Sequence, residues 1–89
     1  MRIDFNLGET RHVKLQIINI KNEPFQITTA KYTMTKLYEN EVLAEGQATI
    51  IDHVLDVVIT PPAAGIYQLE YTYIIGDETL VDVVEVYVS

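Results

Sequence analysis

The chain has 89 residues, no cysteine and a formal net charge of −7. This length suits one domain with a small core, and without thiols the chain has no disulfide, thiolate metal ligand or cysteine nucleophile. The acidic balance disfavours nucleic acid and anionic membranes as partners. No apolar run reaches the length of a membrane span, and the first residues do not resemble a secretory signal.

Charge is divided unevenly along the chain. All six Lys and Arg residues lie within positions 1–36, whereas ten of the 13 acidic residues lie after them. One interpretation is that the halves interleave across strands, which would bring Lys14 near Asp56 and Lys31 near Glu70. The other is a bipolar module whose acidic end docks a basic neighbour.

Alternation of apolar and polar residues predicts seven strands in chain order. We expect them at residues 2–7, 10–20, 25–38, 42–52, 54–60, 66–75 and 80–88. The second changes phase at Ile18 and Ile20, which suggests a bulge, and Gly46 is expected to break the fourth. Turns are expected at residues 22–24, 39–40 and 76–77, after Gly8 has ended the first strand.

Short connections and the lack of helical periodicity favour two packed antiparallel sheets. Residues 36–44 are the best helix candidate, but Glu39 and Asn40 interrupt them. A small closed barrel is the alternative. The predicted core is Val13, Leu15, Ile17, Tyr32, Met34, Ile50, Leu55, Val57, Tyr67, Leu69, Tyr71 and Val86.

The segment from Pro61 to Tyr67 carries the most specific fold signal. Its Pro-x-x-x-Gly-x-Tyr spacing, ahead of an alternating strand, resembles the corner of immunoglobulin-like sandwiches, where a tyrosine hydroxyl binds the loop backbone. We therefore expect residues 1–89 to form a single, seven-stranded antiparallel immunoglobulin-like β-sandwich. In that fold the second strand would pair with the fifth, and the third with the sixth.

No arrangement of catalytic residues is visible. His12 and His53 stand apart and lack a second ligand at metal-binding spacing, so surface strand positions explain them better than a metal site. Ser89 is the only serine and the last residue, which argues against a serine triad. No glycine-rich phosphate loop is present. We expect no enzyme activity and no cofactor.

Asp77, Glu78 and Asp82 gather near one predicted turn. Calcium needs six to eight oxygen ligands, and the pattern of a calcium-binding loop is absent. A solvated turn is the simpler interpretation, and no metal site is predicted.

The six tyrosines could suggest sugar binding. Tyr67, Tyr71 and Tyr73 share the inward face of strand 66–75, where core packing is the better explanation. Tyr38 and Tyr87 have polar or charged neighbours in phase and are better candidates for an interface. The absence of tryptophan weakens a carbohydrate platform further.

The outer strands suggest how the module could associate. Arg2 and Asp4 give the first strand the charges of a guarded edge, whereas strand 80–88 is long and β-branched. We expect association through this final strand, with either a copy of the chain or another protein; the alternative is that the strand is paired and covered. The predicted interface residues are Leu80, Val86, Tyr87, Val88 and Tyr38.

Several short segments together resemble a known family. They are Leu7-Gly8-Glu9-Thr10-Arg11, the stretch from Pro24 to Met34, Gly46-Gln47-Ala48-Thr49-Ile50 and Ala64-Gly65-Ile66-Tyr67. In this order they resemble the N-terminal domain of upper-baseplate proteins from tailed bacteriophages of Gram-positive bacteria. The chain departs from that family at Thr29, where glycine is usual, and it ends before the coiled coil or receptor-binding region that usually follows.

The resemblance implies an immunoglobulin-like module that attaches one virion component to another without catalysis. Its partners would be other virion proteins, and it would be assembled into a virion in the host cytoplasm. The chain would then be an excised baseplate domain or a small virion protein, such as a tail accessory or capsid decoration. The alternative is a bacterial surface or carbohydrate-binding immunoglobulin-like module.

Overall fold

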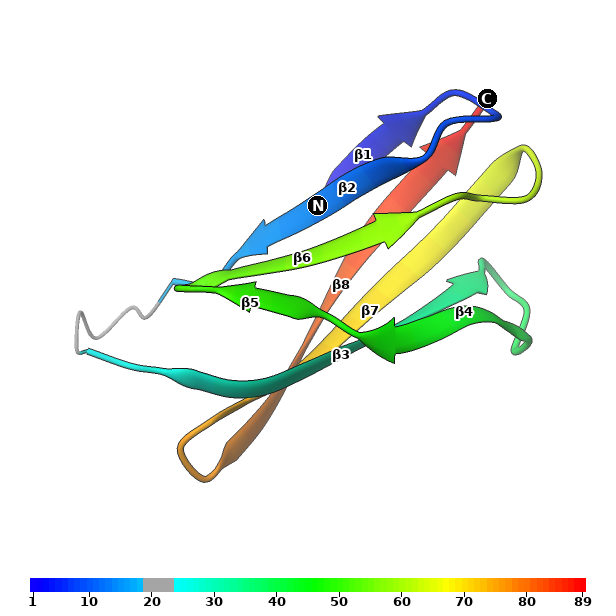
Figure 1. Cartoon of the computed structure of the whole chain (residues 1–89). Coiled ribbons are helices and arrows are strands. Elements are labelled where there is room, and N and C mark those ends of the chain that lie inside the picture. The colour runs from blue at the N-terminus through cyan, green and yellow to red at the C-terminus, as the bar shows by residue number, and fades with distance from the viewer. Residues whose placement is uncertain (19–23) are drawn as a thin grey trace.

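The structure is a computed structural model that describes residues 1–18 and 24–89, and within these ranges it contains strands and no helix. A five-stranded sheet has the order β1-β8-β7-β3-β4, and a three-stranded sheet has the order β2-β6-β5 (Figure 1). The all-β expectation is confirmed. The strands are β1 (Arg2–Phe5), β2 (Arg11–Gln16), β3 (Ile27–Lys36), β4 (Val42–Gln47), β5 (Thr49–Ile51), β6 (Val54–Ile59), β7 (Gly65–Ile75) and β8 (Glu78–Val88).

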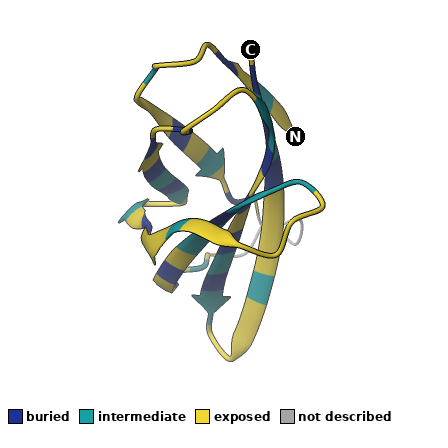
Figure 2. Ribbon diagram, turned by 90° about the vertical axis from the view of Figure 1, so that its right-hand side faces the viewer, coloured by how far each residue is buried: buried dark blue, intermediate teal, exposed yellow. Residues whose placement is uncertain are grey.

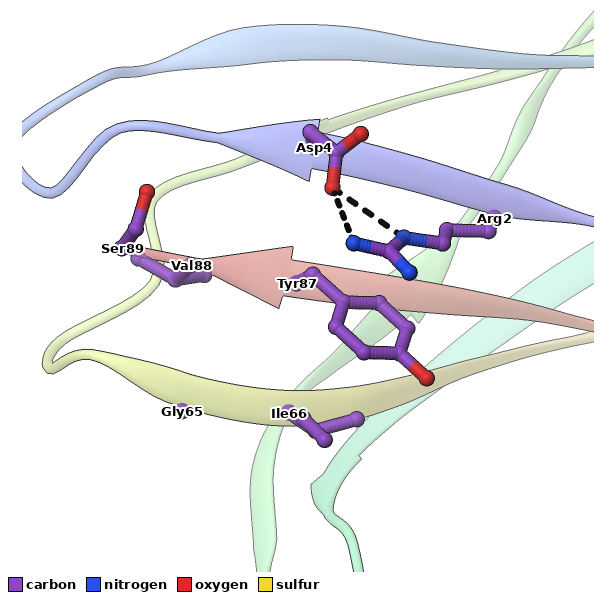
Figure 3. A pocket seen from close by; sticks show the side chains of 7 residues that line it. All are labelled: Arg2, Asp4, Gly65, Ile66, Tyr87, Val88 and Ser89. Atoms are coloured by element: carbon purple, nitrogen blue, oxygen red, sulfur yellow. Dashed lines mark hydrogen bonds and ion pairs between the residues drawn. The ribbon is translucent and has the colours of Figure 1, made fainter.

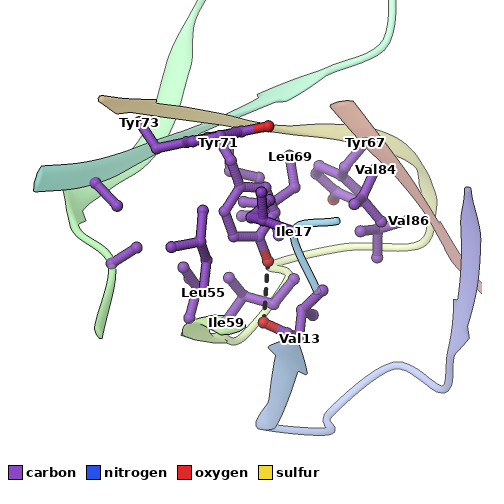
Figure 4. Close-up of a cluster of buried hydrophobic side chains, with 14 of the residues drawn as sticks. Val13, Ile17, Leu55, Ile59, Tyr67, Leu69, Tyr71, Tyr73, Val84 and Val86 are labelled. Carbon is purple, nitrogen blue, oxygen red and sulfur yellow. Dashed lines mark hydrogen bonds between the residues drawn. The ribbon is translucent and has the colours of Figure 1, made fainter. Parts of the chain in front are cut away.

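The core lies between the two sheets, and buried and exposed residues alternate along the strands (Figure 2). The side chain of Tyr71 in β7 extends across this core, and its hydroxyl donates to the carbonyl of Val13 in β2 at 2.9 Å (Figure 4). Most predicted core residues are buried; Leu15, Tyr32 and Ile50 are partly buried and pack against the core. Tyr73, expected on the inward face of its strand, is buried as well. Buried apolar residues outside the predicted core are Phe5, Ile27, Ala30, Ala48, Ile59, Val84 and Val88.

The predicted strand 42–52 is two strands, which raises the number from the expected seven to eight in the described residues. The break is at Ala48 and not at Gly46. Ala48 is buried, and its amide donates to the carbonyl of Ala30 at 3.0 Å, while the chain passes from one sheet to the other. Gly46 stays paired with Tyr32, whose ring lies 3.4 Å from the place of a glycine Cβ.

The final strand is covered on both backbone sides only at its end. β8 pairs antiparallel with β7 along its whole length, but it pairs with β1 only from Glu85 to Val88, so within the described residues the outer backbone side of residues 78–84 has no strand partner. The outermost strands of the five-stranded sheet are β1 and β4, and those of the three-stranded sheet are β2 and β5. The two sheets share no strand, so the closed-barrel alternative does not apply to the described residues.

The predicted strand neighbours are confirmed, because β2 pairs with β6 and β3 pairs with β7. Lys14 lies opposite Asp56, as expected. Lys31 instead lies opposite Thr72, so Glu70 is its diagonal neighbour, opposite Thr33.

The turns follow the sequence signals only in part. Gly76 has φ of 61° and begins the two-residue turn between β7 and β8, as predicted. The turn after β3 lies at residues 37–38 and not at 39–40, and no helix forms there. Ile18 is 74% exposed while Ile17 remains buried, so the expected phase change is not seen at that position. Ile20 and most of the predicted turn 22–24 lie outside the described residues.

Tyr67 forms the corner that the Pro-x-x-x-Gly-x-Tyr spacing indicates. Its hydroxyl donates to the carbonyl of Ala63 at 2.7 Å and accepts from the Ala63 amide at 3.2 Å. Gly65 has φ of 142°, a conformation that favours glycine. The corner thereby fixes the loop between β6 and β7 and the start of β7.

Candidate interaction surface

A cluster that we call the Tyr87 surface lies on the outer face of β1, β8 and β7 and consists of Arg2, Asp4, Ile66 and Tyr87 (Figure 3). The strand register creates it, because Asp4 and Ile66 lie on either side of Tyr87. The alternate residues of these strands, among them Phe5 and Val86, are buried in the core. The four side chains must therefore face outward.

Tyr87 is held in place by charged neighbours. The guanidinium carbon of Arg2 lies 3.7 Å from the centre of the Tyr87 ring, and Arg2 also forms a 3.0 Å ion pair with Asp4. The Tyr87 hydroxyl donates to Glu85 at 3.2 Å. A guanidinium above an aromatic ring is attracted by the ring's quadrupole. These contacts restrict the side chains before any partner arrives, which lowers the entropic cost of binding.

The Tyr87 surface borders a pocket of about 240 Å³ that also involves Gly65, Val88 and Ser89. Small-molecule sites usually enclose roughly 300–1,000 Å³ and are lined mainly by apolar groups. This pocket is smaller, and an exposed ion pair forms part of its wall. The surface therefore suits contact with another protein better than enclosure of a cofactor.

Tyr38 lies at the same end of the sheet as Tyr87. The amide of Leu37 donates to the carbonyl of Ile66 at 2.9 Å, and Ile66 lies directly opposite Tyr87. Tyr38 follows in the turn with φ of 67° and is 97% exposed. A positive φ is uncommon for a bulky residue and is found where the surrounding structure imposes it. Two of the predicted interface residues thus lie at one end of the molecule.

The other three predicted interface residues do not join this surface. Val86 is 0% exposed and Val88 is 6% exposed, because both face the core. The expectation that they are available to a partner is corrected: these two side chains lie on the inward face of β8, which packs against the other sheet. Leu80 is partly buried and pairs with Tyr73 near the β7–β8 turn, about seven residues or roughly 23 Å along the strand from Tyr87.

The residues weighed for catalysis and metal binding have structural contacts. Nδ1 of His12 lies 3.0 Å from both carboxylate oxygens of Asp56. His53 stacks on Phe25 with ring centres 3.9 Å apart, and its Nε2 lies 3.0 Å from the Phe25 carbonyl oxygen. Within residues 1–18 and 24–89, no group of three His, Cys, Asp or Glu side chains could hold a metal ion. Ser89 lies at the end of β8 without a histidine among its hydrogen-bond partners in those ranges.

The acidic turn expected to be solvated has one specific contact. The hydroxyl of Tyr73 donates to Asp82 at 2.6 Å. Burial, with a smaller contribution from Asp82, raises the pKa of Tyr73 to about 12. Burial also raises the pKa of Tyr71, and the negative charge of Asp56 adds to the effect. Both tyrosines are therefore neutral hydrogen-bond donors over the physiological pH range.

Arg2, Asp4 and Ile66 belong to the Tyr87 surface, although the sequence does not predict an interface role for them. For Arg2 and Asp4 it predicts only charges that guard an edge. Their position beside Tyr87 depends on the parallel pairing of the first strand with the last, and no local pattern encodes that pairing. The one available signal was the outward phase that Arg2 and Asp4 share on an alternating strand.

The described residues contain no helix that is long and apolar enough for a membrane span. No family model matches the sequence, and no curated protein or solved structure is significantly similar to it.

Proposed function

We propose that this chain is a non-catalytic docking module of a bacteriophage virion, in the baseplate, as a tail accessory or as a capsid decoration. The observation that carries the proposal is the presence of Tyr87, fixed beneath Arg2, and the fully exposed Tyr38 at one end of the five-stranded sheet. Tyrosine and arginine are the residue types that most often dominate the binding energy of protein interfaces. The proposal that this module belongs to a virion rests on the resemblance of the sequence to upper-baseplate proteins.

We further propose an immunoglobulin-like sandwich topology. Three features support it: two sheets with their buried faces toward each other, the β2–β6 and β3–β7 pairings, and the Tyr67 hydrogen bonds to Ala63. The parallel pairing of β1 with β8 and the passage of residues 42–51 from one sheet to the other are variations within this proposal.

The absence of enzymatic activity is part of the proposal. His12 is engaged with Asp56, and His53 is stacked on Phe25. Within the described residues, neither histidine has a hydroxyl group among its hydrogen-bond partners. We therefore expect the purified protein to show no turnover of phosphatase, glycosidase or protease substrates. Turnover that disappears in His53→Ala would contradict this expectation.

The docking function is testable with the proteins encoded beside this chain. Each would be purified and measured against it by biolayer interferometry. A hot-spot role for Tyr87 predicts that Tyr87→Ala weakens binding by about 2 kcal/mol, or roughly 30-fold. Val58→Ala is the matched control, because Val58 is 49% exposed on the three-stranded sheet. Equal loss in both variants, or binding that ignores Tyr87, would contradict the proposal.

The rival function is a bacterial surface or carbohydrate-binding module. Tyr38 and Tyr87 are the tyrosines available to stack on sugar rings, since Tyr67, Tyr71 and Tyr73 are buried and Tyr32 packs against the core. A specific glycan-array signal that is lost in Tyr38→Ala, without any binding to neighbouring gene products, would favour the rival.

A further inference from the structure

The two outermost strands of the five-stranded sheet, β1 and β4, differ in how well they are protected. At β1, the carbonyls of Met1 and Phe5 accept hydrogen bonds from the amides of Glu85 and Ser89. The carbonyl of Asp4, between them, accepts from the Arg11 guanidinium at 2.8 Å. The same guanidinium lies 4.5 Å from the ring centre of Phe5. A backbone acceptor on this edge is therefore already occupied, and charged side chains flank it, as in many guarded edges.

At β4 no side chain occupies an outer backbone group among the hydrogen bonds of the described residues, although this strand also carries a charge at Glu45 and an irregularity near Val42. β4 pairs with β3 on one side and is the last strand of its sheet. Residues from Ala44 to Gln47 keep a regular antiparallel register with β3, beyond the irregularity near Val42. Val42 and Leu43 are 47% and 38% exposed. An exposed, regular strand with a free backbone side is a template for adding another strand.

Charge indicates what kind of strand would fit. Glu41 and Glu45 are exposed at this edge, and β4 itself carries no Lys or Arg; the neighbouring basic residue is Lys31 of β3, which lies opposite Gln47. Among the described residues, neither glutamate takes part in an ion pair. A strand with lysine or arginine opposite Glu45 would place a positive charge near that carboxylate. Glu41 precedes β4, beyond the irregularity in its pairing with β3, and so does not share the phase of Glu45.

A second copy of the chain fits this edge poorly. Two β4 strands could pair antiparallel with Glu45 opposite Glu45, or with Glu41 opposite Glu45, and both registers bring like charges to facing positions; with residues 42–47 in full overlap, Glu45 would instead lie opposite Ala44. Like charges at facing positions destabilise a strand pair, and each copy carries a net charge of −7. The same acidic edge thus disfavours self-association and favours a cationic partner.

We propose that β4 is a second docking site, which takes an extended, cationic segment of another protein as an added strand. Backbone hydrogen bonds would supply affinity, and Glu41 and Glu45 would select for basic side chains. The site lies at the opposite edge of the sheet from β1 and is therefore separate from the Tyr87 surface, whereas Tyr38, which also supports the function proposed above, lies in the turn between β3 and β4.

The probe is a capped peptide of about eight residues in which lysine and valine alternate, titrated into ¹⁵N-labelled protein and followed by NMR. The expected result is saturable shifts in the amides of residues 42–47, with new protection from hydrogen exchange there. A peptide with glutamate in place of lysine should not bind. A peptide with proline in place of valine keeps the charge but cannot form the ladder, and it should not bind either.

Two matched variants distinguish binding at the β4 edge from general attraction to the acidic protein. Glu45→Lys should weaken lysine-peptide binding by at least about tenfold. Glu70→Lys makes the same charge change about two strand spacings away, because Glu70 and Glu45 lie on opposite sides of Thr33. This variant should change the affinity for the lysine peptide less than about threefold at 0.15 M salt. A folded-state spectrum for each variant verifies that both keep the fold.

Four results would overturn the proposal. One is equal loss in the two variants, and another is binding of the proline peptide, since either would indicate nonspecific charge attraction. A third is a set of shifts centred on β1. The fourth is concentration-dependent dimerisation through β4, which would assign the edge to a second copy.

Discussion

Tyr71 provides the sharpest test of how the two sheets are joined. Its hydroxyl donates to the Val13 carbonyl at 2.9 Å, and the residue is 0% exposed. Tyr71→Phe keeps the ring and so leaves almost no cavity, but it removes the donor. The Val13 carbonyl then loses a partner at a site where Val13 is only 1% exposed, so water cannot readily replace the donor.

Leaving a buried acceptor without its partner costs about 1–3 kcal/mol. In a domain of this size, 1 kcal/mol changes the melting temperature by roughly 4–8 °C. We therefore expect Tyr71→Phe to lower the free energy of unfolding by about 2 kcal/mol and the melting temperature by roughly 8–16 °C. Urea denaturation and thermal melts followed by circular dichroism would measure both.

The control makes the same chemical change at the surface. The Tyr87 hydroxyl donates to Glu85, but both residues are accessible enough for water to replace the bond. Tyr87→Phe should change stability by less than about 0.5 kcal/mol. If Tyr71→Phe were equally mild, the hydrogen bond between the sheets would not stabilise the fold as argued, and the reasoning would fail.

Three further predictions concern stability. Leu69→Ala, at a 0% exposed position, should cost about 2–5 kcal/mol in urea denaturation, and an unchanged midpoint would contradict the assigned core. Gly65→Ala should cost about 1–3 kcal/mol, because φ is 142° and the new Cβ would lie 3.2 Å from Cε of Lys36; a more stable variant would contradict this. The folded pKa of Tyr73 is about 12 against 10.0 in the unfolded chain, so its contribution to stability is complete below pH 10 and is lost as the pH rises toward 12. Tyr73→Phe should reduce that alkaline loss, and an identical pH profile for the variant would show that Tyr73 does not cause it.

The strands and most of the core could be predicted because their signals are local. Residues 67–73 alternate strictly, and the structure buries Tyr67, Leu69, Tyr71 and Tyr73 in the same phase. Gly76 marks a turn because glycine readily adopts positive φ, whatever the rest of the chain does. The Pro61–Tyr67 spacing predicted the corner correctly for a similar reason, since the hydrogen bonds between Tyr67 and Ala63 form within one loop.

The failures share a nonlocal origin. The passage between sheets is at Ala48 because that residue is small enough to be buried beside Ala30, whereas Gly46 looked like the natural break. Tyr38 adopts positive φ against its preference because the neighbouring backbone is tied to Ile66.

The candidate site was predicted only at its two tyrosines. The sequence places Val86 in both the predicted core and the predicted interface. Its alternation with polar residues indicates an inward side chain, but the sequence does not indicate which strand pairs with β8. The parallel pairing of β1 with β8 joins the two ends of the chain, and it buries Val86 and Val88 while it places Arg2 over Tyr87.

Electron cryo-microscopy of the assembled particle would test the docking proposal most directly. Particles of the phage that carries this chain would first be checked for it by mass spectrometry. The account predicts density for the chain in which Tyr38 and Tyr87 contact a neighbouring virion protein. Absence of the chain from the particle, or an incorporated chain whose Tyr38 and Tyr87 face solvent in every copy, would contradict it.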